Sequence, residues 1–100
     1  MSSKITHYEL SNTADLDIDS IFDYTEKEYG FNQAVEYLFN LEAVFNSLVS
    51  NPEIGRKRNE IKDGLISIVE QQQVIFYYVI GNYIHVVRVL HGSRDLPKYF

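Results

Sequence analysis

Two helical segments that meet at one glycine constrain this chain more than any other feature. Apolar side chains recur at three- and four-residue spacing before Gly30, and the same period restarts directly after it. The first stripe consists of Ala14, Ile18, Ile21 or Phe22, Thr25 and Tyr29. The second consists of Ala34, Leu38, Leu41, Phe45 and Leu48, widened by Tyr37 and Val44. A connection of only two or three residues forces two helices to lie as an antiparallel hairpin.

Polar and turn-forming residues mark the ends of this hairpin. The polar residues 11–13 can cap the first helix. Gly30 is expected to end that helix in a left-handed conformation. Pro52 and Gly55 close the second helix, because neither residue favours its continuation.

The remaining segments have the composition of β-strands. Four runs are rich in β-branched and aromatic side chains: residues 4–10, 65–70, 74–80 and 83–91. The two-residue turn at 81–82, Gly-Asn, is typical of a tight hairpin. Residues 74–80 are apolar without alternation, which indicates a central strand covered on both faces.

The sequence therefore predicts one α+β domain spanning residues 1–100. Its N-terminal strand is followed by an antiparallel helix hairpin and then by a three-stranded antiparallel meander. The hairpin is expected to pack on one face of a four-stranded sheet, as a sandwich of two layers. The opposite face of the sheet must be covered by something else or left open.

Composition excludes several classes of protein. The 100 residues contain no cysteine, so a disulfide framework and a thiolate metal site are both excluded. The N-terminal segment lacks a basic region followed by a long apolar run, and no stretch approaches the length needed to span a bilayer. We expect a soluble cytoplasmic protein that does not associate with a membrane.

Charge is distributed unevenly along the chain. Residues 1–55 carry a net charge of −8, whereas residues 56–100 carry +3. Such a division predicts two electrostatic faces, of which one can accept a polyanion. The alternative is that the acidic residues only cover the solvated sides of the helices.

Six short segments, in this order, resemble the RelE/ParE toxin superfamily, and within it the ParE branch. They are A-x-x-D with I-F-D-Y-T (14–25), G-F-N-Q-A-V-E-Y (30–37), N-P-E-I-G-R (51–56), V-I-F-Y (74–77), R-V-L-H (88–91) and R-D (94–95). The resemblance covers nearly the whole chain.

The resemblance implies a toxin of a type II toxin–antitoxin pair, silenced in a hetero-oligomer by a ParD-like antitoxin. ParE relatives poison DNA gyrase through surface binding, without catalysis, and the toxin itself is not expected to bind a specific DNA sequence or a cofactor. RelE relatives instead cleave mRNA on the ribosome. A ribonuclease of the RelE type and a decayed homologue that only binds its antitoxin therefore stay open as alternatives.

Ribonuclease chemistry needs a base, an acid and cations at one phosphate. The resemblance leaves these candidates on the sheet face and C-terminus: Arg88, His91, Arg94, Lys98 and Tyr99. Superfamily members often carry arginine where this chain has Ile66 and Tyr78, so we predict a dismantled cationic pocket and no catalytic residue. The same two substitutions also weaken the expectation that gyrase is the target.

Two sets of residues are candidates for binding other macromolecules. The candidates for binding the target are Arg56, Lys57, Arg58, Arg88, His91, Arg94 and Lys98. The candidates for binding the antitoxin are Tyr78, Tyr83, Tyr99 and Phe100.

Several of these side chains also have a purely structural interpretation. Arg88 either points to the open face of the sheet or pairs with an acid beneath it. A lone histidine such as His91 is more often structural than catalytic. Tyr77 is expected to pack in the core, and Tyr83 to be exposed. The three histidines, at unrelated spacing, predict no metal site.

Overall fold

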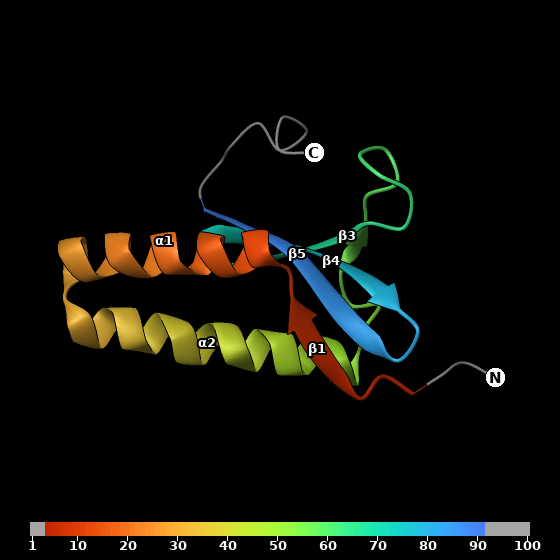
Figure 1. Cartoon of the computed structure of the whole chain (residues 1–100), viewed down its shortest axis with the longest axis horizontal. Helices are drawn as coiled ribbons and strands as arrows, with labels where there is room; N and C mark the ends of the chain where they lie inside the picture. Colours follow the sequence, from red (N-terminus) through yellow and green to blue (C-terminus); the bar gives the residue numbers. More distant parts are fainter. Residues whose placement is uncertain (1–3, 92–100) are drawn as a thin grey trace.

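A helix hairpin lies across one face of a twisted sheet in the computed structural model, which describes residues 4–91 (Figure 1). The elements in chain order are β1 (His7–Leu10), α1 (Asn12–Tyr29), α2 (Phe31–Ser50), β2 (Arg56–Lys57), β3 (Ile66–Glu70), β4 (Gln73–Ile80) and β5 (Tyr83–His91). The strand order is β1-β5-β4-β3-β2, with β1 parallel to β5 and all other pairs antiparallel.

The predicted α+β class, the hairpin and the meander are confirmed. The prediction of a four-stranded sheet is wrong by one strand, because β2 pairs with β3 through only two residues. A strand of two residues is too short to show a period of two in its sequence.

No helix among residues 4–91 is long and apolar enough to cross a membrane.

Ser11 begins α1 and also fastens it to the sheet. The Ser11 hydroxyl accepts a hydrogen bond from the Ala14 amide at 3.0 Å, which satisfies a free donor of the first turn. The same hydroxyl donates to the carbonyl oxygen of Val87 at 2.9 Å. One side chain thus fixes where the helix starts and how it meets β5.

Gly30 alone connects the two helices, so the connection is shorter than the two or three residues predicted. Its φ of 95° is positive, but its ψ of 167° lies far from the left-handed helical value. The prediction of a left-handed cap is therefore wrong in its ψ angle. This combination of angles is almost exclusive to glycine, which explains why a one-residue connection needs glycine here.

The core lies between the hairpin and the sheet, and a smaller cluster lies on the opposite sheet face. The central strand β4 contributes to both, since Ile75 and Tyr77 join the main core and Phe76 joins the smaller cluster. All three side chains are fully buried, as predicted for a strand covered on both faces and for Tyr77 in particular. Ile61, from the loop between β2 and β3, packs against the smaller cluster.

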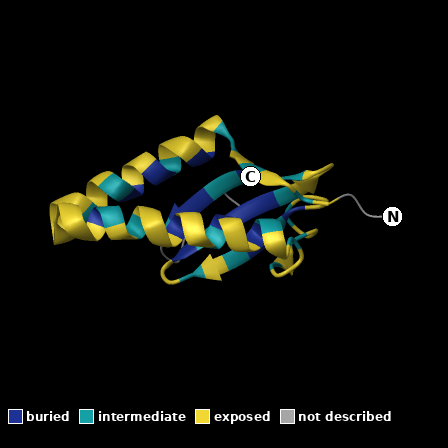
Figure 2. Cartoon of the chain, turned by 90° about the horizontal axis from the view of Figure 1, so that it is seen from below, coloured by how far each residue is buried: buried dark blue, intermediate teal, exposed yellow. Residues whose placement is uncertain are grey.

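The hairpin extends past the sheet, so its far end has little to pack against (Figures 1 and 2). Ala14, Ile18 and Ile21 are buried as predicted. Tyr29 and Leu38, also predicted to be buried, are 69% and 39% exposed. The helical period identified the correct face of each helix, but it carries no information on where the covering sheet ends.

Candidate partner-binding surfaces

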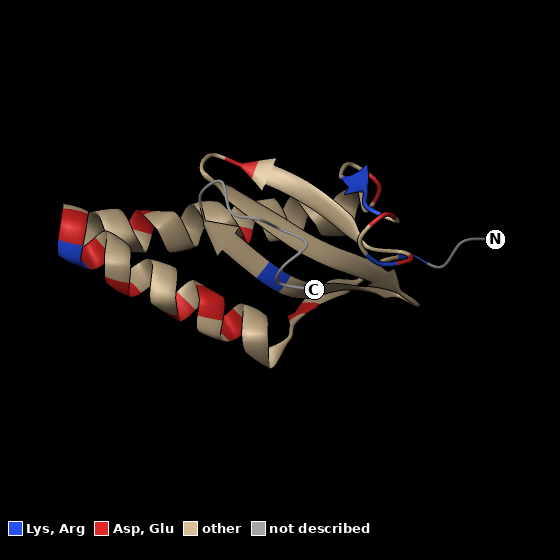
Figure 3. Cartoon of the chain, turned by 90° about the horizontal axis from the view of Figure 1, so that it is seen from above, with Lys and Arg blue, Asp and Glu red and all other residues tan. Residues whose placement is uncertain are grey.

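The basic cluster Arg56–Arg58 divides into two exposed side chains and one that is tied to the protein. Arg56 and Lys57 form the edge strand β2 and are exposed, at the opposite end of the molecule from the hairpin turn (Figure 3). Arg58 donates from Nε to the Glu60 carboxylate at 2.7 Å and from Nη1 to the Ser67 hydroxyl at 3.3 Å. This hydrogen bond from Arg58 lowers the pKa of Glu60. Arg56 and Lys57 are thus the accessible cations of this cluster.

Arg88 takes the second of its two predicted orientations, because it pairs with an acid. Its guanidinium donates to the Asp17 carboxylate from Nε at 2.8 Å and from Nη2 at 3.0 Å. Asp17 also accepts a hydrogen bond from the Val89 amide at 3.0 Å. The hypothesis that Arg88 binds a target is therefore disfavoured, since that contact would break a pair already made within the chain.

Ile66 and Tyr78 do not share a face of the sheet. Ile66 pairs with Tyr77 and packs against the main core, whereas Tyr78 packs against the smaller cluster on the other face. Arginines at these two positions would point to opposite sides. The interpretation of a single dismantled pocket at these positions is therefore wrong for this fold.

Tyr83 forms the centre of a small aromatic group on β1 and β5. Its ring stacks on His7 at 5.4 Å and meets His85 edge-on at 6.2 Å, so Tyr83 is half-buried and less exposed than expected. His7 also contacts Glu9 at 2.9 Å. Within residues 4–91 no group of three histidine or carboxylate side chains has the geometry to hold a metal ion.

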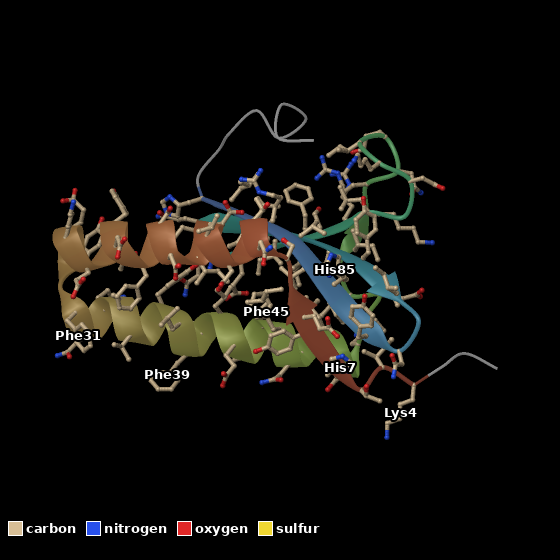
Figure 4. All side chains as sticks on the ribbon, viewed as in Figure 1. Lys4, His7, Phe31, Phe39, Phe45 and His85 are labelled. Carbon is tan, nitrogen blue, oxygen red and sulfur yellow. The ribbon has the colours of Figure 1, made fainter. Side chains whose placement is uncertain are left out.

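The far half of the hairpin carries an exposed apolar surface, which we call the hairpin face. It consists of the exposed Phe31, Leu38 and Phe39 together with the half-buried Phe22 and Val35. Phe31 is 60% and Phe39 is 69% exposed, and Phe39 projects from the side of α2 that faces away from α1 (Figure 4). Phe22 meets Phe31 edge-on at 6.3 Å, so the two helices share this surface.

None of the binding residues predicted from the sequence lies on the hairpin face. The signal was present, because Phe31, Val35 and Phe39 recur at four-residue spacing beside the buried stripe of α2. An apolar arc wider than one core-facing stripe indicates a second contact surface.

His91 ends β5 at the rim of a pocket of about 600 Å³ between the hairpin and the β3–β4 turn. Its ring lies 6.0 Å from the ring of Tyr24. The remaining predicted residues Arg94, Lys98, Tyr99 and Phe100 lie outside the described residues.

Comparison with known proteins gives consistent matches over most of the chain. Residues 8–96 match the family described as "ParE toxin of type II toxin-antitoxin system, parDE". Toxin ParE1 of Mycobacterium tuberculosis is 36% identical over 99 residues, covering 98% of each chain. Toxin ParE1 of Caulobacter vibrioides is 33% identical over 88 residues, covering 88% of this chain and 91% of the relative. A chain of the chromosomal ParDE TA system from P. aeruginosa has the same fold, with a TM-score of 0.77 over 91% of this chain and 100% of that chain at 18% identity.

The fold and these matches define the class of protein, a toxin of a type II toxin–antitoxin system. Within that class, the chain belongs to the ParE toxin family. The resemblance found in the sequence is thereby confirmed.

Proposed function

We propose that this ParE-family chain is a non-enzymatic toxin of the cytoplasm that is neutralised by a ParD-like antitoxin and inhibits DNA gyrase by binding it. The observation that carries the proposal is the exposed hairpin face on a ParE-family fold. Isolated surface phenylalanines are ordinary, but a contiguous group rimmed by charged residues marks a binding surface.

The hairpin face has the chemistry of a protein interface. Phe31 and Phe39 lie eight residues apart, which places them within about 80° of each other around the helix axis. Aromatic side chains are enriched among the residues that dominate binding energy. An amphipathic segment of an antitoxin can cover such a surface by laying its apolar side along α2.

The arrangement of the basic residues supports binding rather than RNA cleavage. Acid, base and cations must converge on one phosphate for strand cleavage. Arg56 and Lys57 lie on β2, three strand spacings or about 14 Å from β5, which carries Arg88 and His91. Arg88 is paired with Asp17 and Arg58 with Glu60. Arg56 and Lys57 are instead accessible for contact with an acidic surface of a target.

Expression of the chain alone in a bacterial host is expected to stop growth, and co-expression of the ParD-like antitoxin encoded beside it should restore growth. The purified chain is expected to reduce supercoiling by DNA gyrase at micromolar concentration and to increase cleaved DNA complexes. Added to a translation extract, it should leave mRNA intact.

Each alternative has its own result in these assays. Cut mRNA with unchanged gyrase activity would establish the RelE-type ribonuclease in place of our proposal. Normal growth without the antitoxin would indicate a decayed homologue.

Changing Phe39 to glutamate is expected to weaken the complex with the antitoxin at least about 30-fold. Loss of an aromatic side chain at the centre of an interface lowers the binding free energy by roughly 2 kcal/mol or more. The fold should be unaffected, because Phe39 is 69% exposed. Isothermal titration calorimetry with the purified antitoxin measures the change.

Asn40→Glu provides the matched control. Asn40 is exposed, adjoins Phe39 and points about 100° away around the helix, off the hairpin face. Both variants add one negative charge. Equal affinities of the two variants would exclude the hairpin face as the antitoxin surface.

A further inference from the structure

The pocket between the hairpin and the β3–β4 turn is lined by an unusual set of neutral polar side chains. Four glutamines and two tyrosines line it: Gln33, Gln71, Gln72, Gln73, Tyr29 and Tyr37. Gln71 holds a left-handed φ of 55° at the turn, a conformation that few residues other than glycine adopt. A positive φ is ordinary in a two-residue hairpin turn such as this one, which brings Gln71 and Gln72 to the pocket.

Two buried polar atoms of this lining have no hydrogen-bond partner within residues 4–91. They are the hydroxyl oxygen of Tyr37 and the amide oxygen Oε1 of Gln73. Gln73 is only 5% exposed. An unsatisfied buried polar group destabilises a protein, so such groups need a specific explanation. Both atoms can accept a hydrogen bond, so a ligand that donates hydrogen bonds would satisfy them.

Charge around the pocket favours a positively charged donor. Among the described residues, its lining contains no lysine, arginine, aspartate or glutamate, so the negative charge comes from the surrounding hairpin and not from the lining itself. The hairpin that forms one wall, residues 12–50, has a net charge of −7, and acidic residues follow both helices (Figure 3). Burial and the nearby negative charge of Asp17 both raise the pKa of Tyr37, so its hydroxyl stays neutral.

We propose that this pocket binds the guanidinium group of an arginine side chain supplied by a partner protein. The planar guanidinium presents five donors in a fixed fork, which suits several amide and hydroxyl oxygens at once. Its flat face also binds to aromatic rings, and Tyr29 and Tyr37 supply two. The volume of about 600 Å³ accommodates one such side chain together with the backbone of its segment.

The first test uses N-acetyl-arginine amide as the probe and NMR of the purified chain as the readout. The probe is expected to shift the side-chain amide signals of Gln73 and the ring signals of Tyr37, with a Kd on the order of 1 mM. N-acetyl-citrulline amide is the matched control, since it has nearly the same shape without the charge. It should bind at least about tenfold more weakly. Equal binding of the two probes, or no shift at these residues, would overturn the proposal.

The second test separates binding from a structural role. Tyr37→Phe removes an unsatisfied hydroxyl, so it should raise the Tm of the protein by roughly 4 °C. The same variant should lower the affinity for the arginine probe at least about fivefold. Tyr24→Phe removes an exposed tyrosine's hydroxyl outside the pocket and should change neither quantity. A lower Tm for Tyr37→Phe, or an unchanged affinity for the probe, would show that the pocket holds only water or structural contacts.

The inference rests on the proposed function, because a partner such as the antitoxin must supply the arginine. The probe itself needs no antitoxin. Failure of the antitoxin to restore growth would therefore refute the proposed function and leave the probe result unchanged. Failure of the probe alone would refute only this inference.

Discussion

Replacing Asp17 by alanine is expected to lower the free energy of unfolding by about 3 kcal/mol, one of the two largest effects that we predict. Asp17 receives two hydrogen bonds from Arg88 and one from the amide of Val89, 71 and 72 residues away in the chain. Removing one partner of a largely buried ion pair leaves the other charge uncompensated and costs roughly 3–5 kcal/mol. The lower value applies because the side chains of Arg88 and Asp17 remain 20% and 16% exposed.

Asp17 lies beside the part of the β5 edge where pairing with β1 has ended. The strand β1 pairs with β5 only as far as Val86, so among residues 4–91 no strand neighbours the following part of that β5 edge. Asp17 reaches this edge from α1 and accepts the amide hydrogen of Val89. An alanine would leave both this amide and the Arg88 guanidinium without their shared acceptor.

Urea unfolding followed by circular dichroism measures the effect, with Asp19→Ala as the control. Asp19 lies on the same helix and is exposed, so its removal should change the free energy of unfolding by less than about 0.5 kcal/mol. The double variant Asp17→Leu/Arg88→Met should lose less free energy of unfolding than the single variants Asp17→Leu and Arg88→Met lose in sum, because no charge is left buried. If Asp17→Ala and Asp19→Ala unfold alike, the pair is not a stabilising contact.

The periodicity of the sequence predicted the elements and the layer arrangement, because apolar spacing directly reflects which side of a helix or strand is buried. The limits of each element were less predictable. Leu38 has the spacing of the buried stripe of α2, but it is exposed to solvent because the sheet does not extend beneath it. The edge strand β2 escaped detection because two backbone pairs suffice to form it.

The candidate site was harder to predict than the fold, since sequence spacing does not show which charges meet. Arg88 and Asp17 are 71 residues apart, and only the packing of α1 on β5 brings them together. The pocket lining combines two helices, a turn and the end of β5 for the same reason. The run of three glutamines at 71–73 has no periodic signal, so the sequence predicts no role for it.

Replacing Gly55 by alanine is expected to lower the free energy of unfolding by about 3 kcal/mol. The reason is lack of space and not backbone conformation, because the φ angle of Gly55 is not positive. An added Cβ would lie 2.7 Å from the Ser67 carbonyl oxygen and 2.7 Å from the Tyr77 hydroxyl, closer than such contacts occur in proteins. The Tyr77 hydroxyl donates to the Pro52 carbonyl at 2.9 Å and accepts the Gly55 amide at 3.2 Å, so the N-P-E-I-G loop is fixed directly to the core. Overpacking contributes roughly 1–3 kcal/mol and a broken hydrogen bond about 1 kcal/mol.

The consequence should be local as well as global, because Gly55 immediately precedes β2. Hydrogen exchange should show faster exchange at the β2–β3 pairing, where Arg56 lies opposite Ser67. Tyr77→Phe alone should lower the free energy of unfolding by only about 1 kcal/mol. Combined with Gly55→Ala, it should relieve the close contact with the Tyr77 hydroxyl but not those with Ile66 and Ser67. If Gly55→Ala has the same free energy of unfolding and the same hydrogen-exchange rates as the original chain, the loop can move away from β3 at little cost. In that case the exposed cations Arg56 and Lys57 would not be held in place by the core, and the edge that we propose for target contact would have no fixed geometry.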